Sequence, residues 1–142
     1  MRKRTKAREC ALQILYQIDI TSDKPESALQ NYWSTNEQPK QIIDFATRIV
    51  DGACQNKDEI DSLITKYAEN WSISRMAIVD RNILRMSIFE LLHCPDVPPK
   101  VCINEAVDLA KKFGDAESGK FVNGILDRIH KETIGSSLLG GK

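Results

Sequence analysis

Residues 100–131, KVCINEAVDLAKKFGDAESGKFVNGILDRIHK, contain the pattern that decides the fold of this chain. Apolar residues recur there at steps of three and four, which predicts two amphipathic helices joined by a short turn after Gly114. The apolar positions are Cys102, Ile103, Ala106, Val107, Leu109, Ala110 and Phe113 in the first helix, and Phe121, Val122, Ile125, Leu126 and Ile129 in the second. Gly124 interrupts the second helix at a cost of ~1 kcal/mol relative to alanine, so we expect another part of the chain to approach it closely.

The same helical period continues through most of the chain. It predicts helices over residues 3–20, 25–33 and 79–92, and a run over residues 39–67 that is long enough for one central helix. Gly52 and Asn56 are positions at which this long run can bend. No segment alternates apolar and polar residues over a useful length. We therefore predict an all-α fold, a helical bundle of six to seven helices.

The length of 142 residues suits one domain. We place this domain at residues 1–132, with a basic arm at 1–8, and expect a flexible tail at 133–142, where no periodicity remains. The chain contains no apolar run long enough to span a membrane and no signal-peptide pattern, so we expect a soluble, cytoplasmic protein. The cysteines form no CxxC pair, which indicates reduced thiols that fill the core. They are Cys10, Cys54, Cys94 and Cys102.

The net charge of zero conceals an uneven distribution. Five of the 20 basic side chains and none of the 20 acidic ones lie in the first eight residues, so the rest of the chain carries a net charge of −5. A basic arm on an acidic body favours a polyanionic partner. We expect the arm residues Lys3, Arg4, Lys6 and Arg8 to contact phosphates. The alternative is a solvated chain end with no binding role.

A second candidate site surrounds the turn between the last two helices. Phe121 opens the final helix beside Lys120, and Lys111 and Lys112 end the helix before it. An aromatic ring surrounded by cations suits an unpaired base and its phosphate, and a helix N-terminus adds free N–H donors. The alternative is that Phe121 is the first core residue of its helix.

Two further side chains have ambiguous roles. Tyr16 lies on the polar face of the first predicted helix, where it can meet a base or a partner, or pack on a neighbouring helix. Arg85 lies between apolar residues of the 79–92 helix, and we expect an internal ion pair with Glu90 or Glu105.

The sequence contains no recognisable catalytic constellation. His93 and His130 are isolated from each other and from any cysteine pair, and no phosphate-binding loop or nucleophile motif occurs. We therefore expect a protein that is not an enzyme and that uses no metal and no cofactor.

Several stretches resemble one protein family in the same order. INEAVDLAKKFG at 103–114 and KFVNGILD at 120–127 are similar to the C-terminal signature of the NusB family of bacterial transcription antitermination factors. ARECALQILYQ at 7–17 resembles its first helix, and residues 80–85 and 96–98 resemble its middle part. The resemblance extends over residues 3–131.

The resemblance implies both a fold and partners. The fold would be two stacked three-helix subdomains. The function would be binding the boxA element of nascent ribosomal RNA together with NusE, a small-subunit ribosomal protein, in a transcription elongation complex that resists termination. The resemblance places the Lys120–Phe121 pair near the RNA strand and Asp80 at the NusE surface, where we expect Tyr16 or Ile20 nearby. It also implies that a homodimer is possible.

Two alternatives remain at this stage. The chain could be a non-catalytic helical module for protein interactions, in which the basic arm is incidental. It could also be a stand-alone relative of the helical domain that precedes some ribosomal-RNA cytosine methyltransferase domains. RNA binding that depends on salt separates the first alternative from an antitermination factor.

Overall fold

The computed structural model describes residues 2–135, and the side chains of residues 2–132. The described part is helical and contains no strand, which confirms the predicted all-α class. The α-helices are α1 (Lys3–Thr21), α2 (Pro25–Thr35), α3 (Lys40–Gln55), α4 (Lys57–Tyr67), α5 (Ile78–His93), α6 (Pro99–Phe113) and α7 (Ser118–Ile129). Two short elements complete the description, the 3-10 turn η1 (Ile73–Arg75) and the π-helical turn η2 (His130–Gly135).

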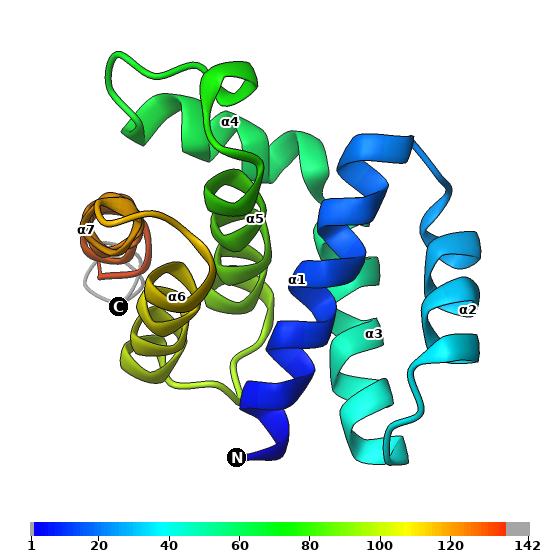
Figure 1. The fold of residues 1–142 in the computed structure, drawn as a ribbon. Coiled ribbons are helices and arrows are strands. Elements are labelled where there is room, and N and C mark those ends of the chain that lie inside the picture. Colours follow the sequence, from blue (N-terminus) through cyan, green and yellow to red (C-terminus); the bar gives the residue numbers. More distant parts are fainter. Residues whose placement is uncertain (1, 136–142) are drawn as a thin grey trace.

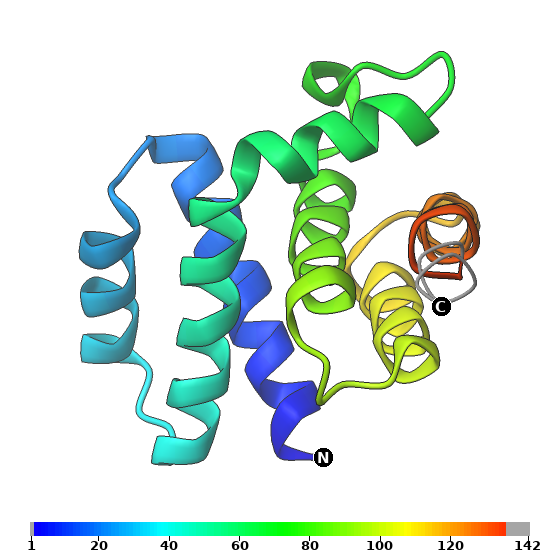
Figure 2. The same ribbon diagram turned by 180° about the vertical axis from the view of Figure 1, so that it is seen from behind.

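Helix α5 lies at the centre of the fold, where it packs against α1, α3, α4, α6 and α7. Helices α1, α2 and α3 stand side by side on one side of α5, and α6 and α7 lie on the other side (Figure 1). Seen from behind, α4 crosses one end of the bundle (Figure 2). This arrangement agrees with two three-helix groups stacked together.

The run predicted as one central helix, residues 39–67, is in fact two helices. The Asn56 side chain donates a hydrogen bond from Nδ2 to the Gly52 carbonyl at 2.8 Å, and its backbone N–H donates to the same oxygen at 3.0 Å. The backbone bond is the last of α3, the side-chain bond caps the same carbonyl, and α4 begins at Lys57. The prediction that residues 39–67 form the central helix of the bundle was also wrong. Helix α5 takes that place because Ile83, Leu84 and Met86, which point to different sides, are all fully buried.

The close approach expected at Gly124 occurs instead at Gly52. A Cβ atom built on Gly52 would lie 2.1 Å from the ring of Phe89, whereas one built on Gly124 meets nothing within 4 Å. The missing side chain of Gly52 therefore lets α5 pack closely against α3. The sequence shows that Gly124 interrupts an apolar stripe, but it does not show which glycine faces a neighbouring helix.

Ion pairs connect α5 to its neighbours. The prediction that Arg85 forms an internal ion pair is confirmed, but its partners differ from those expected. They are Asp19 at 3.0 Å and Asp61 at 2.9 Å. Glu90 and Glu105 instead bind an arginine of α1.

The last part of the chain only partly lies within the description. Residues 133–135, which were predicted to begin the tail, belong to the backbone turn η2, and residues 136–142 lie outside the described residues. Within the described part, no helix is both long and apolar enough to cross a bilayer. The four cysteines are free thiols, and three of them are buried.

Candidate nucleic-acid interface

The basic arm forms the first turns of α1. Arg2, Lys3 and Arg4 are exposed and Lys6 is half-buried, so four of the five predicted cations reach the surface. Helix α1 begins at Lys3, without a side-chain cap on its first N–H groups. The arm therefore forms the first turns of a packed helix, with Arg2 directly before it.

The structure corrects the expectation for Arg8. Its side chain is only 4% exposed and lies between two carboxylates. Its Nε donates to Glu90 at 3.0 Å and its Nη2 to the same carboxylate at 2.8 Å, while Nη1 donates to Glu105 at 3.1 Å. A buried guanidinium with these partners has no face left for a phosphate. Arg8 thus ties α1 to α5 and α6.

Two of the three lysines predicted near the last turn share one groove. Lys111 and Lys120 line a groove of about 520 Å³ between α6 and α7. Gly119 allows this approach, because a Cβ atom built there would lie 3.3 Å from Cγ of Lys111. Lys112 leans the other way, toward α1, where its Nζ lies 2.7 Å from Glu9. The groove therefore offers two cations, and the carboxylate of Asp108 also lines it.

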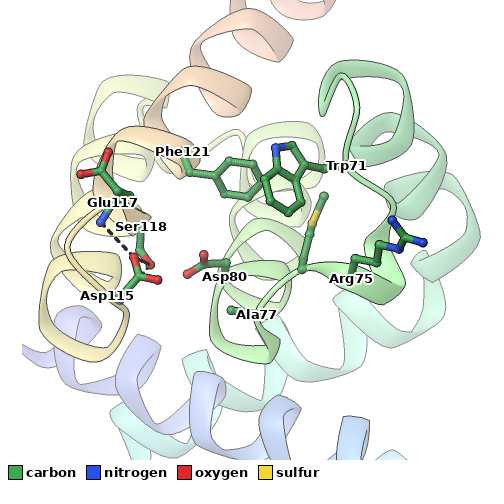
Figure 3. Close-up of a pocket in the computed structure, with 9 residues that line it drawn as sticks. Trp71, Arg75, Ala77, Asp80, Asp115, Glu117, Ser118 and Phe121 are labelled. Carbon is green, nitrogen blue, oxygen red and sulfur yellow. Dashed lines mark hydrogen bonds between the residues drawn. The ribbon is translucent and has the colours of Figure 1, made fainter.

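Phe121 does not share that groove. Its ring lies in a separate cavity of about 270 Å³, next to the indole ring of Trp71 (Figure 3). The two ring centroids are 6.4 Å apart and the planes meet edge to face at 73°. Phe121 is half-buried and Trp71 is 54% exposed. Phe121 therefore has features of both predicted alternatives: its side chain is partly buried, and it also lines a cavity that is open to a ligand.

The cavity around Phe121 is acidic rather than cationic. Asp80, Asp115 and Glu117 line it, and Arg75 is its one basic lining residue (Figure 3). The expectation that lysines surround the Phe121 side chain was wrong, because no lysine in the described part of the chain lines this cavity. Lys120 precedes Phe121 directly, so the two side chains point about 100° apart on the helix.

Asp80 is buried at the floor of this cavity. The residue is 8% exposed, and Oδ1 has no hydrogen-bond partner among the described residues. Burial raises the pKa of the Asp80 carboxyl, the charge of Asp115 raises it further, and the Ser118 hydroxyl acts in the opposite direction. A buried acceptor left unpaired is costly, so this oxygen is suited to a donor from a ligand.

Tyr16 and Ile20 form a separate exposed pair on α1. They lie four residues apart, on one face of the helix, and Ile20 is 57% exposed. The cavity that contains Asp80 is lined by η1, the start of α5 and the start of α7, and by no residue of α1. The structure thus brings Asp80 together with Phe121 rather than with the α1 pair in this cavity.

Sequence reasoning missed Trp71 as a member of the site. The residue lies between α4 and η1 and follows Asn70, which has a positive φ of 66°. A tryptophan flanked by polar residues in a break of the helical pattern was the available signal, because a core tryptophan is expected within a stripe.

Comparisons with known proteins show which family this chain resembles. The NusB family model matches residues 5–131. The transcription antitermination protein NusB of Syntrophus aciditrophicus is 47% identical over 93% of this chain and 84% of that protein, and the one of Myxococcus xanthus is 46% identical over 91% and 95%. Each relative covers nearly the whole described domain.

Solved structures show the same likeness. NusB of T. maritima superposes with a TM-score of 0.83 at 40% identity, covering 91% of each chain. A crystal structure of the antitermination factors NusB and NusE in complex with double-stranded RNA gives a TM-score of 0.83 at 36% identity, covering 92% of this chain and 98% of that one. Sequence and fold lead to one assignment: this chain belongs to the NusB family.

Proposed function

We propose that this protein binds the boxA element of nascent ribosomal RNA together with NusE, and so helps an RNA polymerase elongation complex to resist termination. In this role it acts as an adaptor without catalysis. The observation that carries the proposal is the set of exposed cations Arg2, Lys3 and Arg4 at the start of α1, on an otherwise acidic protein. Exposed cations grouped in this way can neutralise the phosphates of an RNA backbone.

Further cations extend the proposed RNA surface beyond the arm. Lys6 continues the arm, and Lys111 and Lys120 face a common groove. Lys112 belongs to the same helix end, although Glu9 neutralises part of its charge. Lysine side chains of this kind contribute non-specific affinity, because they contact phosphates rather than base edges.

The cavity of Trp71 and Phe121 is the proposed place for selective recognition. Two aromatic rings offer a surface on which an unpaired base can stack. The free Oδ1 of Asp80 then accepts a hydrogen bond from a donor of the base or of NusE. The exposed pair Tyr16 and Ile20 supplies an apolar surface for NusE.

The relatives favour this function over the other two. The curated proteins most similar to this chain are transcription antitermination proteins, matched over most of their length. The named relatives do not point to a stand-alone relative of a methyltransferase's helical domain or to a module without RNA binding. A homodimer that covers the RNA surface stays a prediction, which sedimentation of the RNA-free protein would test.

One titration tests the proposal. A fluorescent single strand that carries boxA is titrated with the protein, alone and with NusE present, next to a strand of scrambled sequence. We expect saturable binding that prefers boxA and tightens with NusE. Equal affinity for both strands, with no effect of NusE, would contradict the proposal.

A further inference from the structure

Arg48, in the middle of α3, is held beside the arm by a shared carboxylate. Asp96 accepts hydrogen bonds from Arg48 Nη2 at 2.8 Å and from Arg48 Nη1 at 3.2 Å, and one from Arg4 Nη2 at 3.2 Å. The three residues come from α3, from the connection between α5 and α6, and from α1. Figure 1 shows that the start of α1 and this connection lie at the same end of the bundle.

An aromatic ring supports both guanidinium groups. The centroid of Phe45 lies 4.3 Å from the Cζ of Arg4 and 6.0 Å from that of Arg48. Cations at this distance are attracted by the face of the ring. The two arginines are therefore held in position before any ligand arrives, which reduces the entropy lost on binding.

The surface beside them is concave and positive. A groove of about 470 Å³ is lined by Lys3, Arg4, Gln41, Asp44, Phe45 and Arg48, which gives three cations against one carboxylate. The Lys3 ammonium donates a hydrogen bond to the Gln41 side chain, which brings the arm against α3. The groove therefore continues the basic surface of the arm onto a second helix.

Both arginines keep donors that Asp96 does not use. A guanidinium carries five N–H donors in a planar fork, of which Asp96 engages those on two nitrogens of Arg48 and on one of Arg4. The side chains are 39% and 50% exposed, respectively. The spare N–H groups suit the bidentate geometry of a phosphate.

The sequence alone does not reveal this site, because Asp96 neutralises part of its charge and Arg48 lies far from the arm along the chain. The bonds from Arg48 and Arg4 hold the pKa of the Asp96 carboxyl well below its usual range, so it stays ionised and neutralises part of the cluster. The neighbours of Arg48 in the sequence are mostly apolar, and none of them is basic. Its membership of the basic surface arises only because α3 packs against α1.

We propose that Arg48 is a phosphate-contacting residue, and that the RNA strand bound by the arm continues across α3 in the groove between Arg4 and Arg48. This inference rests on the proposed RNA-binding function and extends its surface to α3. An acidic protein segment would meet the same donors. The continuity of the groove with Lys3 and Arg4 favours the nucleic acid.

The test compares two matched arginines. Arg128 on α7 is also 39% exposed and also pairs with one carboxylate, Glu69, at 3.1 Å. The affinity for the boxA strand is measured at several salt concentrations for the wild type, for Arg48→Gln and for Arg128→Gln. Arg48→Gln should flatten the slope of log K against log salt by about 0.7, the value for one phosphate on a single strand, and Arg128→Gln should not.

A measurement on the wild-type protein covers the case in which Arg48→Gln does not fold. The NMR signal of the Arg48 Nε–H should shift as the boxA strand is added, while that of Arg128 should stay in place. An unchanged salt slope for folded Arg48→Gln, or an unmoved Arg48 signal at RNA saturation, would overturn the inference.

Other outcomes separate this inference from the proposed function. If Arg48→Gln leaves RNA binding intact but weakens binding to NusE, the groove is a protein site and the inference is wrong. The wild type could bind boxA, and Lys3→Gln could flatten the slope of log K against log salt while Arg48→Gln leaves it unchanged. In that case only the role of Arg48 fails. Absence of any RNA binding by the wild type would remove the proposed function itself.

Discussion

Arg8 on α1 and Glu90 on α5 form a buried ion pair, with Nη2 and Oε1 2.8 Å apart and both side chains at most 4% exposed. Glu105 binds the same guanidinium from α6. The positive charge of Arg8, which the sequence places in the basic arm, therefore lies in the core. This pair determines how the arm is anchored, and it leads to a direct test.

Replacing Arg8 should damage the fold rather than the RNA surface. Arg8→Gln leaves the buried Glu90 carboxylate without its cation, while Glu105 keeps a contact with Arg2 at 3.7 Å. Breaking a buried pair in this way costs ~3–5 kcal/mol. Urea denaturation measures the loss in free energy of unfolding. The neighbouring Lys6→Gln is the control and should change that free energy by no more than ~0.5 kcal/mol. A stable Arg8→Gln that binds RNA poorly would show that Arg8 contacts RNA after all.

Asp19 gives the structure a defined sensitivity to acid. Bonds from Arg81, and then from Asn82, lower the pKa of Asp19 to about 2 against the opposing effect of burial. A carboxyl with a lowered pKa in the folded state stabilises the protein above its unfolded pKa, and this stability disappears as pH falls through the folded value. The shift corresponds to about 2 kcal/mol. It should be present at neutral pH and lost between pH ~4 and ~2.

The comparison of wild type with Asp19→Asn isolates this contribution. The difference in free energy of unfolding should shrink as pH falls through that window. Asp44→Asn removes an exposed carboxylate from the ion pair with Lys40 and should cost at most ~1 kcal/mol. A difference between wild type and Asp19→Asn that does not vary with pH would refute the assignment.

Asp80 should show the opposite dependence on pH. Because burial raises its pKa in the folded state, ionising this carboxyl costs stability, and the cost develops as pH rises from the unfolded pKa of ~4 through the folded value. Asp80→Asn removes that cost, so it should be more stable than the wild type at pH 7 and lose this advantage near pH 3. A separate variant, Asp80→Ala, removes the free acceptor and should weaken NusE or RNA binding. Unchanged stability at both pH values would mean that Asp80 is solvated.

The paired aromatic residues should affect RNA binding more than folding. Trp71→Ala and Phe121→Ala should each lower the affinity for boxA by ~1–3 kcal/mol if a base stacks in their cavity. A fully buried phenylalanine would cost ~3–5 kcal/mol of folding stability, and half-buried Phe121 should cost less. Phe113→Ala is the control, since Phe113 is partly exposed at the end of α6 and does not line the cavity. Full RNA affinity in both cavity variants would exclude stacking there.

The sequence predicts the helices well because burial imposes the helical period. The stripe of Ala7, Cys10, Ala11, Ile14 and Leu15, for example, is buried as its spacing predicts. Asn56 was expected only to bend the long run, because the apolar period continues past it, whereas in the structure α3 ends there with a side-chain bond to Gly52. Periodicity records which residues face the core, and it does not record where the axis changes direction.

The site was less predictable, because its contacts join distant parts of the chain. Arg8 and Glu90 are 82 positions apart, and Arg48 and Asp96 are 48 apart. Charge counted along the sequence placed Arg8 in the arm, although its position on the apolar side of α1 turns it inward. The same count omitted Arg48, whose neighbours in the sequence are mostly apolar. Only the packing of α1, α3 and α5 decides which cations reach the surface.

The central claim is that the exposed cations of the arm bind RNA phosphates, and the salt dependence of boxA binding tests it most directly. The measurement compares the wild type with a triple variant, Lys3→Gln, Arg4→Gln and Lys6→Gln, which leaves the buried Arg8 in place. Each phosphate neutralised on a single strand contributes about −0.7 to the slope of log K against log salt, so the variant should flatten the slope by about two units while keeping the wild-type melting temperature within a few degrees. An unchanged slope in the folded triple variant would contradict the account.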